Sequence, residues 1–396
     1  MPAIGSRIAS RIGGLQPTAV NAILSEVRAL EAHGRKFASL MRGEPDFATP
    51  PHIVEAATRA LHDGRTGYPD NRGEMGLRLA VEEKLTRENG IDYDPVSEIL
   101  ITDGATLGIS AALMALISAG DAVMLPDPVY DAYQSPIRLA GGRIVRVPSR
   151  FENGRFHLDP ADLEASYTRD VKVLILNTPW NPVGTVFSPP ELERIAEFVI
   201  RRDLVLLSDE IYEWITYEGN KHVSPVAIAR DLRDHAVLIN SFSKTYSMTG
   251  WRLGYCAGPK DIIQAMFMVL AQSSRGPATF IQDAGVAALS GPQTCVDEMR
   301  DAYAQRRALV LETLSGLPRI RPLPPEGGFF SMVDIRETGI PSNEVRRRLL
   351  HDSGVVVIHG AAYGERGEGT LRVSFASGGN KLITGLDLLR QGLGAL

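Results

Sequence analysis

Short, wholly apolar runs alternate with segments of helical period through the middle of the chain. Most of these runs are followed by turn residues and then by a helical pattern, as at 190–201 after the sequence Asn-Pro-Val-Gly. Strands that are apolar throughout and separated by helices are typical of a mainly parallel sheet covered by helices on both faces. The predicted strands are 98–102, 122–125, 143–147, 172–177, 204–208, 236–240 and 253–257.

The pattern changes after about residue 290, where longer helices and a Pro-rich stretch appear. The expected elements are a helix at 295–315, strands at 328–334 and 371–375, and helices at 342–353 and 380–393. We therefore predict an α/β protein with two domains. The large domain spans 46–290, and a smaller α/β domain is built from 1–45 and 291–396.

Composition narrows the classes of protein that fit. The chain has 396 residues, 44% of them hydrophobic, and a net charge of −5, so it lacks the basic excess expected of a nucleic-acid-binding protein. Its longest apolar stretch, near 109–117, is far shorter than a membrane span. Cys256 and Cys295 match no metal-ligand spacing and form no disulfide framework. We expect no metal and no membrane partner.

The first residues allow two interpretations. Arg7 and Arg11 occur before the first acidic residue, Glu26, which faintly resembles a transit peptide. An ordered arm or an amphipathic helix is the interpretation we favour. With the free cysteines, it predicts a cytoplasmic protein.

Polar clusters follow four of the predicted strands. They lie at 103–106, 177–184, 209–212 and 241–244. Open α/β sheets bind ligands beyond the carboxyl ends of their strands, so these clusters predict one site.

The strongest chemical signal is the run 241–254. Lys244 can form a Schiff base with a carbonyl cofactor when its amine is free to attack. The hydroxyls of Ser241 and Ser243 and the guanidinium of Arg252 are suited to a phosphate group. A single lysine is most often a solvated surface residue, but the complete run favours the functional interpretation.

The cluster at 209–212 supplies a carboxylate at the end of an apolar strand. Burial of Asp209 is costly unless the carboxylate has a partner, and a protonated pyridine nitrogen is such a partner. Tyr212, three residues later, can reach a phenolic oxygen on the same ring. An isolated aspartate here is more often a helix cap. The presence of Lys244 reverses that preference.

Local sequence alone does not decide the role of two of the polar clusters. Asn-Pro-x-Gly at Asn181 is most often a turn, and the alternative is a donor to the phenolic oxygen. The residues at 103–106 open a helix whose free N–H groups make a phosphate seat, or they form an ordinary turn and cap.

Together these motifs resemble the class I and II aminotransferases of fold type I, in the aspartate aminotransferase superfamily and its bacterial subgroup. The likeness runs from 43–47 to 371–375. The resemblance implies a pyridoxal 5′-phosphate enzyme that moves an amino group between an L-amino acid and a 2-oxo acid by a ping-pong mechanism. It also implies a homodimer with shared active sites.

The same resemblance implies roles for individual residues at the cofactor. Lys244 would be the Schiff-base lysine, and the catalytic residues would be Lys244, Asp209 and Tyr212. Asp209 would pair with the ring nitrogen. Asn181 and Tyr212 would flank the phenolic oxygen. Tyr130 would stack on the ring. The residues around the phosphate would be Gly104, Ala105, Thr106, Ser241, Ser243, Arg252 and, from the partner subunit, Tyr68.

At the substrate, the resemblance implies that Arg372 holds the α-carboxylate with help from Gly43 and Asn181. The chain departs from its dicarboxylate-using relatives, because Ala105 replaces their lysine and Gly14 their N-terminal arginine. Aspartate and prephenate are therefore less secure substrates. Arg275 either replaces the missing lysine opposite a distal carboxylate or forms an interface salt bridge.

Two other functions remain as alternatives. A lyase or synthase of the β-elimination type would use the same cofactor residues, so only substrate assays separate it from an aminotransferase. An effector-sensing regulator would normally carry a DNA-binding extension, but only about 40 residues precede Gly43 and they lack a helix-turn-helix pattern.

Overall fold

The largest element is a seven-stranded sheet with the strand order β2-β10-β9-β8-β7-β3-β4. The computed structural model describes residues 7–396; residues 1–6, the start of the predicted N-terminal arm, lie outside the described residues. Strand β10 is antiparallel to both of its neighbours, and the other pairings between neighbours are parallel. The strands are β2 (Ile99–Thr102), β3 (Ala122–Asp127), β4 (Arg143–Pro148), β7 (Val171–Asn177), β8 (Val205–Asp209), β9 (Ala236–Ser241) and β10 (Gly254–Ala257).

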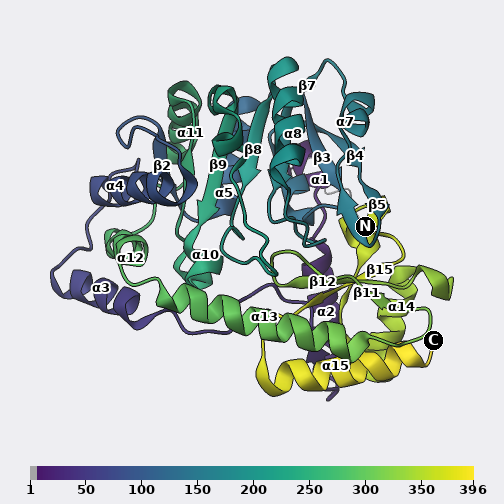
Figure 1. The fold of residues 1–396 in the computed structure, drawn as a ribbon. Coiled ribbons are helices and arrows are strands. Elements are labelled where there is room, and N and C mark those ends of the chain that lie inside the picture. The colour runs from purple at the N-terminus through teal and green to yellow at the C-terminus, as the bar shows by residue number, and fades with distance from the viewer. Residues whose placement is uncertain (1–6) are drawn as a thin grey trace.

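Both faces of this sheet are covered by helices, as the apolar strands predict (Figure 1). Successive side chains of a strand point to opposite faces, so Leu206 and Leu207 enter different core clusters. One cluster includes α5 (Ala105–Leu116), α6 (Gln134–Leu139) and α11 (Lys260–Ser273); the other includes α4 (Met75–Lys84), α8 (Pro189–Arg201) and α12 (Thr279–Ser290). The predicted fold class is confirmed.

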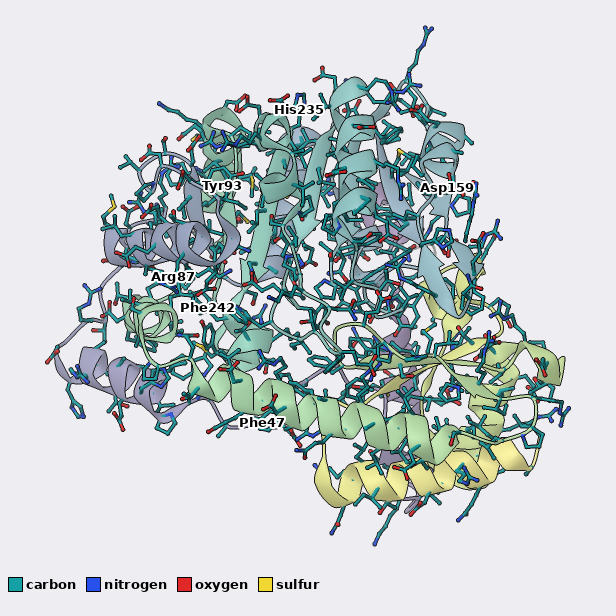
Figure 2. All side chains as sticks on the ribbon, in the orientation of Figure 1. Phe47, Arg87, Tyr93, Asp159, His235 and Phe242 are labelled. Atoms are coloured by element: carbon teal, nitrogen blue, oxygen red, sulfur yellow. The ribbon has the colours of Figure 1, made fainter. Side chains whose placement is uncertain are left out.

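A second, antiparallel sheet has the order β11-β12-β15-β14. Its strands are β11 (Arg321–Pro322), β12 (Phe330–Asp334), β14 (Ile358–His359) and β15 (Thr370–Ser374), and the helices packed with it are α13 (Thr294–Leu314), α14 (Ser342–Arg348) and α15 (Gly379–Gly394). Helix α13 runs from the region of α12 to this sheet, with α15 alongside it (Figure 1). Phe47 lies beside α13 (Figure 2), with its ring centre 5.4 Å from that of Tyr303 in an edge-to-face arrangement. The predicted domain boundaries stay a prediction.

The N-terminal segment packs against β14 of the second sheet. It contains α1 (Ser10–Gly13) and α2 (Ala19–Glu31), and Thr18 caps α2 by accepting a hydrogen bond from the N–H of Asn21. Ile23 and Val27 of α2 pack against Tyr363 and its neighbours. Strand β1 (Ala38–Ser39) pairs with β13 (Val355–Val356). This docking brings the start of α2 to the cavity described below.

The other elements connect or cover these sheets. Asn153 and Gly154 both have positive φ, as a two-residue hairpin turn requires, and they join β5 to β6. Among residues 7–396 no helix combines the length and apolarity needed to cross a bilayer. The remaining α-helices and strands are α3 (Pro51–His62), β5 (Arg150–Glu152), β6 (Arg155–His157), α7 (Pro160–Ser166), α9 (Pro225–Ile228) and α10 (Phe242–Thr245).

Candidate active site

A cavity of about 430 Å³ opens at the carboxyl ends of the strands of the large sheet. All four predicted polar clusters contribute to its lining, together with residues of α2 and of the second sheet. The predicted site residues in its wall are Gly43, Ala105, Thr106, Tyr130, Asn181, Asp209, Tyr212, Ser241, Ser243, Lys244, Arg252 and Arg372. Gly104 is not in the lining but lies against the Arg252 guanidinium, and neither Tyr68 nor Arg275 lines the cavity.

One end of the cavity gathers donors suited to a phosphate. Gly104 precedes α5 with a φ of +81°, and a Cβ there would lie 2.7 Å from the Arg252 guanidinium. Only glycine allows this close approach without strain. The first N–H groups of α5 have no partner within the helix and point outward from its start. The hydroxyls of Ser241 and Ser243 lie 2.8 Å apart at the same end.

Lys244 extends from α10 into the cavity. Its Nζ donates a hydrogen bond of 2.7 Å to the Gly43 carbonyl. Removal of the amine from water lowers the pKa of Lys244 to about 8. A neutral amine, the form that attacks carbonyls and accepts protons, is therefore readily available near neutral pH.

Asp209, at the end of β8, is a buried carboxylate. Burial raises the pKa of Asp209 to about 6, although a 2.5 Å hydrogen bond from the Tyr133 hydroxyl acts in the opposite direction. Tyr133 lies outside the four polar clusters that predict the site. A signal was present, because Tyr133 follows Tyr130 by three residues in a 3₁₀ turn, where such side chains share a face.

Asn177 is a second residue whose role the sequence did not reveal. Its side-chain amide donates to the Asp209 carbonyl at 2.9 Å, and its oxygen accepts the Asn181 N–H at 2.7 Å. Asn177 thus ties the strand that carries Asp209 to the turn that carries Asn181. Tyr212 lies nearby, with its ring edge-on to Phe329 and Phe330.

Arg372, on β15, forms the opposite wall. It is 2% exposed, with Phe330 stacked 4.1 Å from its guanidinium carbon. Its Nη1 donates to the Asn181 side-chain oxygen at 3.2 Å and its Nη2 donates to the Met41 carbonyl at 2.7 Å. The Arg372 Nε has no acceptor among the described residues. A buried guanidinium that has an unused N–H, and no carboxylate in ion-pair contact within residues 7–396, is suited to binding a carboxylate ligand.

Tyr68 and Arg275 lie together on the surface. Tyr68 is 88% exposed, and the Arg275 guanidinium carbon lies 5.6 Å from the centre of its ring. Neither residue lines this chain's own cavity. Their predicted roles, which require a partner subunit, remain predictions.

The residues present fit the predicted cofactor. Arg252 donates to the backbone carbonyls of Thr249 and Asp103 and keeps its charge for an anion. Within residues 7–396, Asp209 has no basic side chain in ion-pair contact, as expected of a carboxylate reserved for a pyridinium nitrogen. Asn181 uses its oxygen for Arg372, which leaves its amide N–H groups free to donate to a phenolic oxygen.

Comparisons with known proteins agree with this geometry. Residues 35–386 match the family model described as "Aminotransferase class I and II". The chain is 37% identical over 388 residues to aromatic-amino-acid aminotransferase 2 of Thermococcus litoralis, covering 97% of each chain. It is 35% identical to an aspartate aminotransferase of Geobacillus stearothermophilus, covering 97% of this chain and 98% of that one. A solved aspartate aminotransferase of Rhizobium meliloti superposes with a TM-score of 0.94 at 32% identity, covering 98% of this chain and 99% of that one.

The resemblance inferred from the motifs is therefore confirmed, as are the transaminase class and the cofactor. The chain belongs to the class I and II aminotransferase family and is a pyridoxal 5′-phosphate-dependent aminotransferase.

Proposed function

We propose that the cavity around Lys244 is the active site and that it transfers an amino group from an L-amino acid to a 2-oxo acid in two half-reactions. The observation that carries this proposal is the meeting of Lys244, Asp209 and Arg372 in one cavity. When bound, pyridoxal 5′-phosphate supplies an aldehyde that combines with amines and a protonated ring that accepts electron density from the substrate Cα.

Each residue contributes a defined action. Arg372 binds the substrate α-carboxylate and thereby orients the Cα proton towards Lys244. The lowered pKa of Lys244 lets its amine accept that proton and return it. Asp209 holds a proton on the ring nitrogen. The phosphate is bound by the free N–H groups at the start of α5 together with the side chains of Ser241, Ser243 and Arg252.

The donor is tested with single amino acids. Cofactor-loaded enzyme is mixed with one amino acid and no acceptor, and the visible absorbance of the bound cofactor is followed. We expect the absorbance to fall with productive donors and to return when a 2-oxo acid is added. A lyase would instead release ammonia continuously with no need for an acceptor. The curated relatives are named for aspartate or aromatic amino acids, so both classes belong in the first panel.

The proposal includes a homodimer with shared sites. Tyr68 and Arg275 support it, because both are surface residues outside their own chain's cavity. Lys244→Ala subunits are mixed with Tyr68→Phe subunits, each impaired as a homodimer. Heterodimers then contain one site free of both changes, and activity returns towards about a quarter of the wild-type value. Heterodimers that form without regaining activity contradict shared sites.

We also propose that the enzyme is cytoplasmic. The support is its free thiols at Cys256 and Cys295, which suit a reducing compartment. Fractionation of cells that express the tagged full-length chain tests this.

A further inference from the structure

One charged group in the cavity wall has no part in the mechanism above. Asp131 begins a 3₁₀ turn, Asp131–Tyr133, directly after the ring-stacking candidate Tyr130. Its side chain lines the cavity beside Thr18 and Asn21 of the N-terminal segment. The other charged residues of the lining already have roles; they are Lys244, Arg252, Asp209 and Arg372.

The Asp131 carboxylate is only partly satisfied. The residue is 7% exposed, and its Oδ2 accepts a 2.7 Å hydrogen bond from the N–H of Ala19, the first residue of α2. Its Oδ1 is buried and has no hydrogen-bond donor among residues 7–396. The N–H groups of Asp131 and Ala132 are near the carboxylate, but neither is aligned as a hydrogen bond to Oδ1.

The surroundings act on the ionisation of this carboxylate in both directions. Burial raises the pKa of Asp131 above its usual range, and the Ala19 N–H and the charge of Arg372 offset only part of this rise. The start of α2 adds the positive end of a helix dipole. Arg372 is not in ion-pair contact with Asp131; its own hydrogen bonds go to Asn181 and Met41. When it is ionised, this buried and half-satisfied carboxylate places a negative charge in the cavity wall, where solvent screens it poorly.

We propose that Asp131 determines specificity in the substrate side-chain subsite, favouring a side chain that ends in a cationic hydrogen-bond donor over one that ends in a carboxylate. This rests on the proposed function only in taking Arg372 as the α-carboxylate site. A ligand cation compensates the buried charge, whereas a second carboxylate is repelled by it. Ala105, which also lines the cavity, supplies no opposing cation.

The test compares three ligands that share one carboxylate and lack an α-amino group. Pentanoate ends in a methyl group, glutarate in a carboxylate and 4-guanidinobutanoate in a guanidinium. Their dissociation constants are measured by calorimetry on the cofactor-loaded enzyme. Asp131→Asn is the informative variant, because an amide oxygen still accepts from Ala19 while the charge is removed. Asp301→Asn is the matched control, since it makes the same change on an exposed part of α13.

We expect Asp131→Asn to strengthen glutarate binding relative to pentanoate by about tenfold and to weaken 4-guanidinobutanoate relative to pentanoate by a similar factor. Asp301→Asn leaves both ratios unchanged. Unchanged ratios in a folded Asp131→Asn protein would instead assign Asp131 to capping α2 and overturn the proposal. Asp131→Ser, which also retains an acceptor oxygen, repeats the measurement if the amide variant does not fold.

The proposed function and the proposed role of Asp131 can be contradicted independently of each other. If no amino acid changes the cofactor absorbance, transamination at this cavity is contradicted, while the binding ratios still report on Asp131. If donors react but the ratios do not move, only the role of Asp131 is lost.

Discussion

The two ends of the cavity are built from different kinds of sequence. At the cofactor end, Ser241, Ser243, Lys244 and Arg252 come from one short run beside the large sheet. At the substrate end, Arg372 comes from β15, Gly43 from the segment after β1, and Asp131 is held against α2. Contiguous motifs at strand ends can be recognised one by one. Arg372 and Gly43 lie outside such motifs and were assigned only through the family resemblance, and Asp131 was assigned no role.

The chemistry of the two ends also differs. At the cofactor end, burial moves the pKa of Asp209 up and that of Lys244 down, each towards neutrality. Such groups are suited to proton transfer. At the substrate end, Arg372 and Asp131 keep opposite charges close together without an ion pair. The first end is suited to chemistry, and the second is suited to selection among ligands. Changes at the first end should therefore alter kcat, and changes at the second should alter relative affinities.

The largest expected effect is that of Lys244→Ala. Loss of the amine removes both the covalent attachment of the cofactor and the acceptor of the Cα proton, so kcat should fall about 10⁴-fold. Steady-state turnover measures this, with Lys381→Ala on the exposed face of α15 as the control. Borohydride treatment should attach the cofactor to the peptide that contains Lys244. Attachment to a different lysine would show that the assignment is wrong.

Asp209→Ala should produce the next largest loss. Without the carboxylate the ring nitrogen is not kept protonated while charge develops at Cα, and kcat should fall about 10³-fold. The loss should lie in proton abstraction, so a donor deuterated at Cα should show a larger isotope effect than with wild type. Circular dichroism and saturating cofactor control for folding and occupancy. Near-normal turnover under those conditions contradicts the role.

The fold and the site differ in how much of each could be predicted from the sequence. The seven strands of the large sheet and the helix now called α13 were predicted closely, because apolar runs and helical periods are local signals. Asp209 was identified because it ends an apolar strand in a chain that also carries the Lys244 motif. Tyr133 and Asn177 were not given roles, because their partners are the Asp209 carboxylate and backbone, which only the folded sheet brings near. Asp131 was missed for the same reason: its partner, Ala19, is on a helix 112 residues away in sequence.

Tyr133→Phe is expected to have an intermediate effect and a distinct pH signature. The Tyr133 hydroxyl stabilises the ionised form of Asp209, so its removal should raise the pKa of Asp209 further above about 6. The carboxylate is then protonated at a higher pH. The acid limb of the kcat/KM profile should therefore shift to higher pH, with a loss of about tenfold below neutrality.

The measurement is a pH–rate profile from about pH 5 to 8 for Tyr133→Phe and for Tyr167→Phe. Tyr167 packs on Phe198, away from the cavity, and its variant should follow the wild-type profile. A uniform loss at every pH would mean that Tyr133 only supports the packing of the site.

The smallest expected effect is that of changing Arg275. This residue bears on the comparison of the two ends because, in a dimer, it would bring a side chain of the partner subunit to the substrate end of the cavity. Arg275 has a φ of +72° and stacks on the exposed ring of Tyr68, outside its own cavity. If it enters the partner's cavity, its guanidinium offsets the charge of Asp131 and pairs with a distal carboxylate. Arg275→Ala should then raise KM for glutamate about fivefold and leave KM for methionine nearly unchanged, because only the acidic donor loses a partner. The alternative, an interface salt bridge, predicts equal losses for both donors and a weaker dimer in sedimentation.

Combining Arg275→Ala with Asp131→Asn separates the two roles of Arg275 further. If both residues act on the same distal carboxylate, Asp131→Asn restores part of the glutamate affinity that Arg275→Ala removes. A purely structural Arg275 gives no such recovery.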